Sequence, residues 1–210
     1  MNHSTIVIIL IYTLILVGIV SMAFAEHHYF EPQWFWQGSP ILCLVDIPKG
    51  DLYSTLSASS LWKRTLKDYN GGTGFGYVLK VTHSGDMSLC NGYLYQSDNF
   101  VPNRGTGITP IGLTSCNGVC TLTVDRNYNE GKEYYNTVVH EVGHFLGLGH
   151  RLPYSTNGII SIFLSDDVMM PIAKPMVHIT KDSLDALIRF NLDQRFINYT
   201  LPHNNEWLIK

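Results

Sequence analysis

The stretch "VVHEVGHFLGLGH", residues 138–150, places three histidines, a glutamate and three glycines among apolar residues. A helix repeats every 3.6 residues, so His140 and His144 project from one face, one turn apart, and two imidazoles can reach one metal ion. Gly147 can adopt a positive φ that ends the helix and turns the chain, which returns His150 as a third ligand. Three neutral imidazoles with a fourth position open are typical of a catalytic zinc site, whereas structural sites close all four positions.

Glu141 completes this arrangement. It follows His140 but points about 100° around the helix axis, which places its carboxylate beside the metal and outside the ligand set. Zinc lowers the pKa of a bound water towards neutrality and polarises a substrate carbonyl. Glu141 can take the proton of that water and pass it to the leaving amine. The pattern therefore predicts a zinc metalloendopeptidase, with Glu141 as the general base and then the general acid. A histidine-rich core helix would not explain the glycine between the histidines.

The metzincin signature H-E-x-x-H-x-x-G-x-x-H resembles the pattern formed here by His140, Glu141, His144, Gly147 and His150. Metzincins also have a methionine turn below the zinc, and "DDVMMP" (166–171) resembles it, with Met169 as the turn methionine that supports the ligands. Together with the later "ITKDSLDALIRF" (179–190), the chain is most similar to the matrixin catalytic domain.

The expected strands come first, with helices before and after them, which indicates an α+β or mixed α/β layer fold. The resemblance implies a zincin-like arrangement of a twisted, mostly parallel sheet with an antiparallel edge strand, an active-site helix and a smaller C-terminal subdomain. It also implies that a protein or peptide substrate binds as an extended strand along that edge. We expect the edge strand near "CTLTVD" (120–125).

Local patterns predict the individual elements. "ILCLVDIP" (41–48) is typical of a buried strand. Asp51 is expected to cap one helix over residues 52–70, with a single apolar face formed by Leu52, Leu56, Leu61, Trp62 and Leu66. The remaining predictions are strands at 75–83 and 93–98, a hairpin around Asn117-Gly118, and helices at 132–146 and 179–190, the last capped by Thr180.

Composition indicates one domain. The chain has 210 residues, 45% of them hydrophobic and 15% charged, which suffices for a substantial core. A net charge of -3 without a Lys/Arg cluster argues against nucleic-acid binding. No repeat or linker divides the chain into independent domains, so we expect an N-terminal segment (26–40), one catalytic domain (41–192) and a C-terminal tail (193–210). We also expect the protein to be a monomer.

The amino terminus indicates export. An apolar run from Ile6 to Val20 precedes Ala23-Phe24-Ala25, which fits the small-residue pattern of a signal-peptidase site. We therefore expect a signal peptide at 1–25 and a secreted protein that begins near Glu26. The alternative is an uncleaved membrane anchor, because the run with its flank reaches about 20 residues, roughly the thickness of a bilayer. The protein contacts a membrane only under this alternative, and its folded part lies outside the cytoplasm under both.

Four cysteines in an exported chain indicate two disulfides, for which three connectivities exist. A three-residue loop with one residue in the left-handed region would place Cys116 opposite Cys120 across a hairpin, which leaves Cys43 for Cys90.

Calcium is a further candidate ligand, as in many matrixins. Asp98, Asp125, Asp166 and Asp167 could supply oxygens, but no complete calcium loop is present, so no site is assigned.

A different class of function competes with catalysis. A zinc-stabilised, non-catalytic binding module at the cell surface would keep His140, His144 and His150 as ligands. The intact Glu141 favours the enzyme.

Overall fold

The computed structural model describes residues 36, 38–69, 76–98, 100, 111–128, 131–150, 167–170 and 178–197. The expected signal peptide or anchor lies outside these residues, as does most of the expected N-terminal segment and C-terminal tail. Among the described residues, no helix combines the length and the apolar character needed to cross a membrane.

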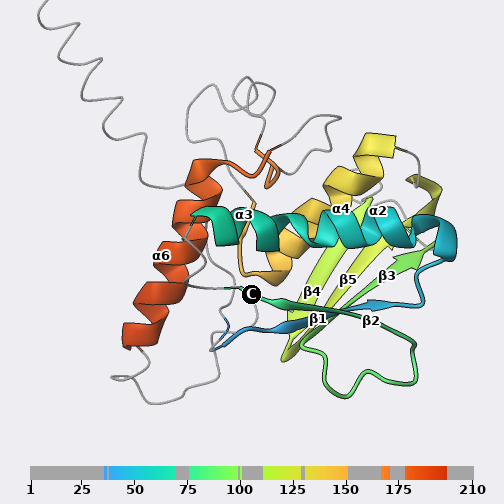
Figure 1. Ribbon diagram of the computed structural model, residues 1–210, viewed down its shortest axis with the longest axis horizontal. Helices are drawn as coiled ribbons and strands as arrows, with labels where there is room; N and C mark the ends of the chain where they lie inside the picture. Colours follow the sequence, from blue (N-terminus) through green and yellow to red (C-terminus); the bar gives the residue numbers. More distant parts are fainter. Residues whose placement is uncertain are drawn as a thin grey trace, which may run out of the picture.

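One sheet forms the centre of the fold (Figure 1). Its five strands follow the order β2-β1-β3-β5-β4, and all neighbours are parallel except β4, which pairs antiparallel with β5 at one edge. The fold class is thus the expected one, a mixed α/β arrangement with a mostly parallel sheet and an antiparallel edge strand. The strands are β1 (Ile41–Val45), β2 (Val78–Thr82), β3 (Gly92–Ser97), β4 (Gly112–Asn117) and β5 (Val119–Asp125).

The expected position of the edge strand was wrong. Residues 120–125 belong to β5, which lies between β3 and β4, and the antiparallel edge strand is β4. In β5 the side chains of Cys120, Leu122 and Val124 are buried, and this apolar row stabilises a strand in the interior of a covered sheet. In β4, half-buried and exposed residues alternate along "GLTSCN", a polar sequence that suits an edge.

The predicted helix over residues 52–70 is two helices, α2 (Lys49–Ser59) and α3 (Leu61–Tyr69), which meet at Ser60. The Ser60 hydroxyl donates to the carbonyl of Ser57 at 3.0 Å, a type of bond that competes with the helical ladder. The predicted cap was also wrong. The Pro48 carbonyl accepts the backbone N–H groups of Asp51 at 2.9 Å and Leu52 at 3.0 Å, so Asp51 lies in the first turn.

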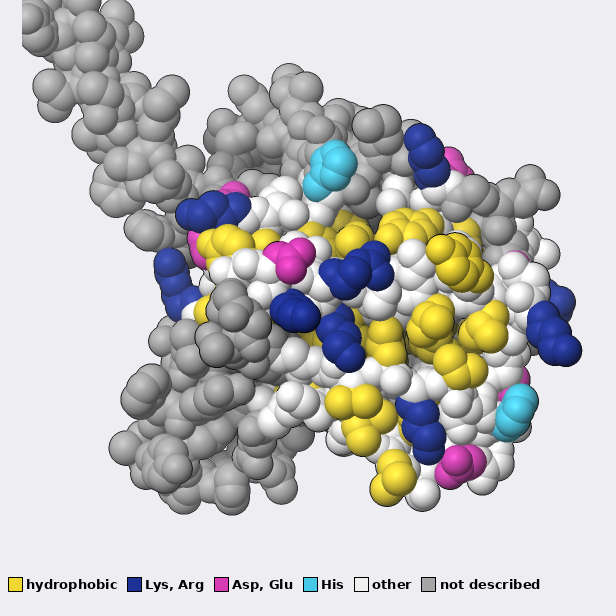
Figure 2. Space-filling model, in the orientation of Figure 1, with side chains coloured by type: hydrophobic (Ala, Val, Ile, Leu, Met, Phe, Trp, Pro, Cys, Tyr) yellow, Lys and Arg dark blue, Asp and Glu magenta, His cyan; other side chains and the backbone are white. Residues whose placement is uncertain are grey.

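The break also divides the expected apolar face. Trp62 and Leu66 on α3 are buried, whereas Leu56 on α2 is 38% exposed. Apolar side chains remain exposed on the face of the molecule in Figure 2, and the exposed apolar residues include Tyr53 on α2 and Val81 on β2. The two helices therefore do not share one continuous apolar face towards the core.

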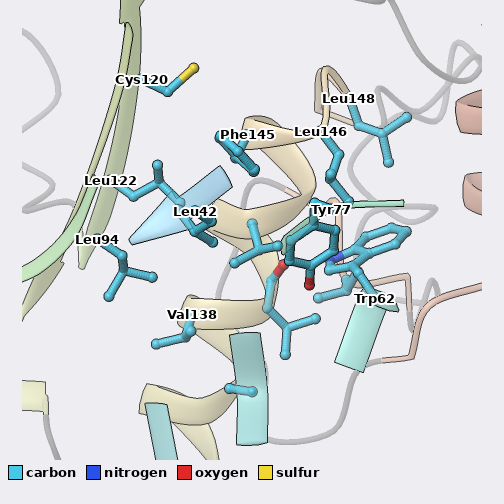
Figure 3. Close-up of a cluster of buried hydrophobic side chains, with 14 of the residues drawn as sticks. Leu42, Trp62, Tyr77, Leu94, Cys120, Leu122, Val138, Phe145, Leu146 and Leu148 are labelled. Carbon is cyan, nitrogen blue, oxygen red and sulfur yellow. The ribbon is translucent and has the colours of Figure 1, made fainter. Parts of the chain in front are cut away.

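Helix α4 (Gly131–Phe145) packs against β4 and β5, as well as against α2 and α3. In Figure 3, Leu42, Leu94 and Leu122 from the strands lie on one side of α4, and Trp62 and Tyr77 lie on its other side. Each fully buried apolar side chain contributes about 1.5–3 kcal/mol to folding. As predicted, α4 buries Val138, Val142 and Phe145, and the turn after it buries Leu146. The Trp62 indole N–H donates to the Val139 carbonyl at 2.8 Å and so fixes α3 on α4.

The last helix, α6 (Lys181–Ile197), extends beyond the expected domain boundary at 192. Thr180 caps it as predicted, because its hydroxyl accepts the N–H of Ser183 at 3.3 Å. Leu184 and Leu187 are buried in the main core. The helix therefore belongs to the same packed unit as the sheet.

Two disulfides confirm the favoured pairing, Cys43 with Cys90 and Cys116 with Cys120. The second pair closes the β4–β5 hairpin, where Cys116 lies opposite Cys120 in the ladder. Gly118 has a φ of 75°, so it is the left-handed residue that this tight turn requires.

Candidate active site

Three histidine rings converge at the end of α4. The ring centroids of His140 and His144 are 4.6 Å apart, and the His150 ring lies 5.2 Å and 4.8 Å from them. One nitrogen from each ring lies within 4.8 Å of the others. Within the described part of the chain, these three residues are the one group of three or more His, Cys, Asp or Glu residues spaced to hold a metal ion.

The turn after α4 returns His150 to the helix. Gly147 has a φ of 106°, and its N–H donates to the His144 carbonyl at 2.8 Å. The Leu148 N–H donates to the Gly143 carbonyl at 3.1 Å. This pair of bonds is the Schellman motif, which requires a left-handed residue at the position of Gly147. The predicted role of this glycine is confirmed.

Two backbone carbonyls orient the rings. Nδ1 of His140 donates to the Val168 carbonyl at 2.6 Å, and Nδ1 of His144 donates to the Leu148 carbonyl at 2.7 Å. A carbonyl can only accept, so Nδ1 carries the proton in both rings and Nε2 keeps its lone pair. Partners of this kind fix the tautomer of histidines that ligate metals.

Two of these nitrogens have a spacing that suits a tetrahedral zinc site, and all three rings have the charge state of a metal ligand. Nε2 of His140 and Nε2 of His150 are 3.2 Å apart. Zinc–nitrogen bonds of about 2.0–2.1 Å in tetrahedral geometry put two ligand nitrogens roughly 3.3 Å apart. Burial lowers the pKa of His140 to about 4 and that of His144 to about 3, and it lowers the pKa of His150. The rings are therefore neutral at pH 7 and can bind a metal ion.

Glu141 directly follows His140 on α4, and its carboxylate is not part of this cluster. Its side chain is 4% exposed, and burial raises its pKa to about 7. The Thr114 hydroxyl donates to its Oε2 at 2.6 Å, which acts in the opposite direction on the pKa. A carboxyl group with a pKa near the working pH can both accept and donate a proton.

Residues 167–170 form a turn beneath α4, in which the Met170 N–H donates to the Asp167 carbonyl at 3.2 Å. Met169 is fully buried. A Cβ on Gly143 would collide with the Met169 Sδ and would lie 3.1 Å from the Met169 Cε. The turn therefore packs against the helix at Gly143, between the two histidines.

Asp167 holds this turn to α6. Its carboxylate is fully buried and accepts bonds from the Met169 N–H at 2.8 Å, from the Ser183 hydroxyl at 2.8 Å and from the Thr180 hydroxyl. The sequence had made it a calcium candidate, but its oxygens serve as an internal acceptor.

Two other calcium candidates are also engaged. Asp125 accepts the Asn127 N–H at 2.8 Å, and Asp98 forms an ion pair with Arg126 at 3.8 Å. The fourth, Asp166, lies outside the described residues. Calcium stays unassigned.

Sequence reasoning missed Thr114 and Gly112. A Cβ on Gly112 would lie 2.9 Å from the Glu141 Cδ and 2.7 Å from the Thr137 Cγ2, so the carboxylate occupies space that only glycine leaves open. Strand alternation could have placed both residues on one face of β4, but the pairing of that face with α4 is not a local property.

Trp36 packs against the C-terminal end of α4. Its indole N–H donates to the Phe145 carbonyl at 2.7 Å, and the two ring centroids are 5.2 Å apart. This residue therefore fixes the described start of the chain to the last turn of α4.

No protein-family model matches the chain, and no curated protein matches its sequence. Among solved structures, the chain is similar to metalloproteinase-II from Bacteroides fragilis, with 15% sequence identity and a TM-score of 0.46. The match covers 79% of this chain and 57% of that one, so this chain spans little more than half the length of the solved protein.

Proposed function

We propose that this protein is a secreted zinc-dependent endopeptidase of metzincin type, similar to the matrixins. The observation that carries the proposal is the convergence of three neutral imidazoles beside one buried glutamate. Structural zinc sites close all four positions, usually with cysteines, whereas three histidines leave one position for substrate. The described cysteines are all paired in disulfides and so supply no thiolate.

His140, His144 and His150 would hold the metal through Nε2, with the first two rings fixed by their carbonyl partners. Zinc, when bound, supplies a Lewis acid that polarises the scissile carbonyl and acidifies water. Glu141 accepts a proton from the attacking water and then transfers it to the leaving amine. Its raised pKa, caused by burial, suits both steps at neutral pH.

The substrate would bind as an extended strand along β4. Within the described residues, β4 pairs with β5 on one side only, so its other side can pair with a peptide backbone. Because Thr114 of β4 contacts Glu141, a peptide on this edge would lie close to the general base.

The test is hydrolysis of a mixed peptide library by the purified protein, with its zinc content measured. Glu141→Gln should retain one zinc and lose about 10²–10⁴-fold in kcat, because it lacks the general base. Glu133→Gln is the matched control, since it makes the same change at an exposed position on the same helix. Zinc binding without hydrolysis by the parent would instead support the non-catalytic binding module.

A further inference from the structure

Thr114 lies on the face of β4 that contacts α4. Successive side chains of a strand point to opposite faces, so Gly112 and Thr114 share the helix-facing side, whereas Leu113 and Ser115 are exposed on the other side. This is the side on which Gly112 closely approaches Glu141. The edge strand therefore presents one small residue and one hydroxyl to the glutamate.

The Thr114 hydroxyl is the one hydrogen-bond donor that the described residues offer to the Glu141 carboxylate. Its oxygen lies 2.6 Å from Oε2 of Glu141 and 3.3 Å from the backbone carbonyl of the same residue. The hydroxyl has a single proton, and bonds to a charged acceptor are shorter and stronger, so the carboxylate is the preferred partner. The contact fixes one carboxylate oxygen, Oε2, against the edge strand.

The position of this hydroxyl is set by the sheet and not by the helix. Thr114 pairs with Leu122 in the β4–β5 ladder, and the Cys116–Cys120 disulfide closes the hairpin two positions further on. Glu141 has three side-chain torsions and can adopt several rotamers, so a fixed donor at the end of the chain selects one of them. The threonine hydroxyl thus provides an orientation that α4 alone does not impose.

We propose that Thr114 is the positioning residue of the general base: its hydroxyl holds Glu141 in the orientation that transfers the proton. The inference rests on the proposed function of Glu141. On this proposal β4 has two roles, because the strand that would pair with the peptide substrate also holds the side chain of Glu141. Groups that orient a site residue in this way typically contribute 10–100-fold.

The experiment compares the full-length protein with Thr114→Val, Thr114→Ser and Thr114→Ala, in steady-state cleavage of one peptide with zinc content measured. Valine keeps the shape and removes the donor, so kcat should fall about 10–100-fold, with KM within about threefold and zinc unchanged. Serine keeps the donor and should restore kcat to within about threefold of the parent. Thr123→Val is the matched control, because Thr123 lies on the adjacent strand between the buried Leu122 and Val124 and so faces away from α4.

Serine and alanine differ only by the hydroxyl, so this pair decides the question even if the valine variant fails to fold. Equal kcat values for the serine and alanine variants would overturn the role of Thr114. If Glu141→Gln abolishes cleavage while all Thr114 variants match the parent, the positioning role is lost and the proposed function survives. A parent that cuts no peptide overturns both.

Discussion

Met169 occupies the space that a side chain on Gly143 would fill. The Met169 Sδ and Cε and the Trp62 ring all lie within contact distance of a Cβ placed on this glycine. Gly143 precedes His144 directly, so α4 and the turn at residues 167–170 pack together at the position where this glycine lacks a side chain. The glycine between the histidines is therefore a packing requirement.

Gly143→Ala should destabilise the protein by about 1–3 kcal/mol, because the added methyl overpacks the contact with Met169. A glycine replaced by alanine within a helix ordinarily stabilises it by about 1 kcal/mol, so the expected sign is reversed here. Gly50→Ala on α2 is the control, since a Cβ there meets nothing within 4 Å. Urea unfolding of both variants checks this, and a stabilised Gly143→Ala protein would show that the turn does not pack against the helix.

Asp167→Ala should destabilise the protein by about 3 kcal/mol or more, because three donors lose their buried acceptor. It should also weaken zinc binding, since the turn that it fixes supplies the Val168 carbonyl to His140. Asp68→Asn, at an exposed position on α3, should change neither property. Zinc titration and thermal unfolding measure the two effects, and a variant with parental zinc affinity would separate Asp167 from the site.

Glu141→Gln should stabilise the zinc-free protein at high pH. Burial raises the pKa of Glu141 from 4.5 to about 7, so the folded state favours the protonated carboxyl. The contribution of Glu141 to the stability of the parent is then greatest below pH 4.5 and is lost as pH rises to about 7. The amide stays neutral throughout, so the variant should gain roughly 3 kcal/mol over the parent at pH 8 and little at pH 4.5.

Urea unfolding with a chelator present, at both pH values, measures this difference. The effect of the histidines is common to parent and variant and cancels in the comparison. A gain that does not change with pH would contradict a raised pKa for Glu141.

The parts of the site that follow from local geometry could be predicted from the sequence. The four-residue spacing of His140 and His144 fixes their common face, and the positive φ of Gly147 fixes the return of His150. The Cys116–Cys120 pair was equally local, because a tight hairpin brings both residues opposite one another.

The contacts between elements could not be predicted in this way. Thr114 is 27 positions from Glu141 in the chain, and their contact depends on which strand lies at the sheet edge. The resemblance to metzincins led us to expect that edge near residues 120–125, but the pattern of a single strand does not determine which strands lie beside it. The break at Ser60 was missed because the short polar stretch around it is also compatible with a continuous helix.

The two disulfides should differ in how much they contribute to the stability of the protein. Cys43 and Cys90 are 47 positions apart, so this bond restricts a long loop of the unfolded chain and should contribute about 4 kcal/mol. Cys116 and Cys120 are 4 positions apart, for which the same relation gives about 2 kcal/mol. Replacing each pair by alanines and measuring urea unfolding tests this order.

Activity should follow the opposite order. The Cys116–Cys120 bond closes the hairpin that holds Thr114 against Glu141, so its loss should lower kcat even at temperatures where the protein stays folded. The Cys43–Cys90 bond ends on β1, away from β4, and its loss should leave kcat unchanged under those conditions. If removal of the Cys116–Cys120 bond lowers stability but not kcat, the helix and not the edge strand sets the position of the glutamate.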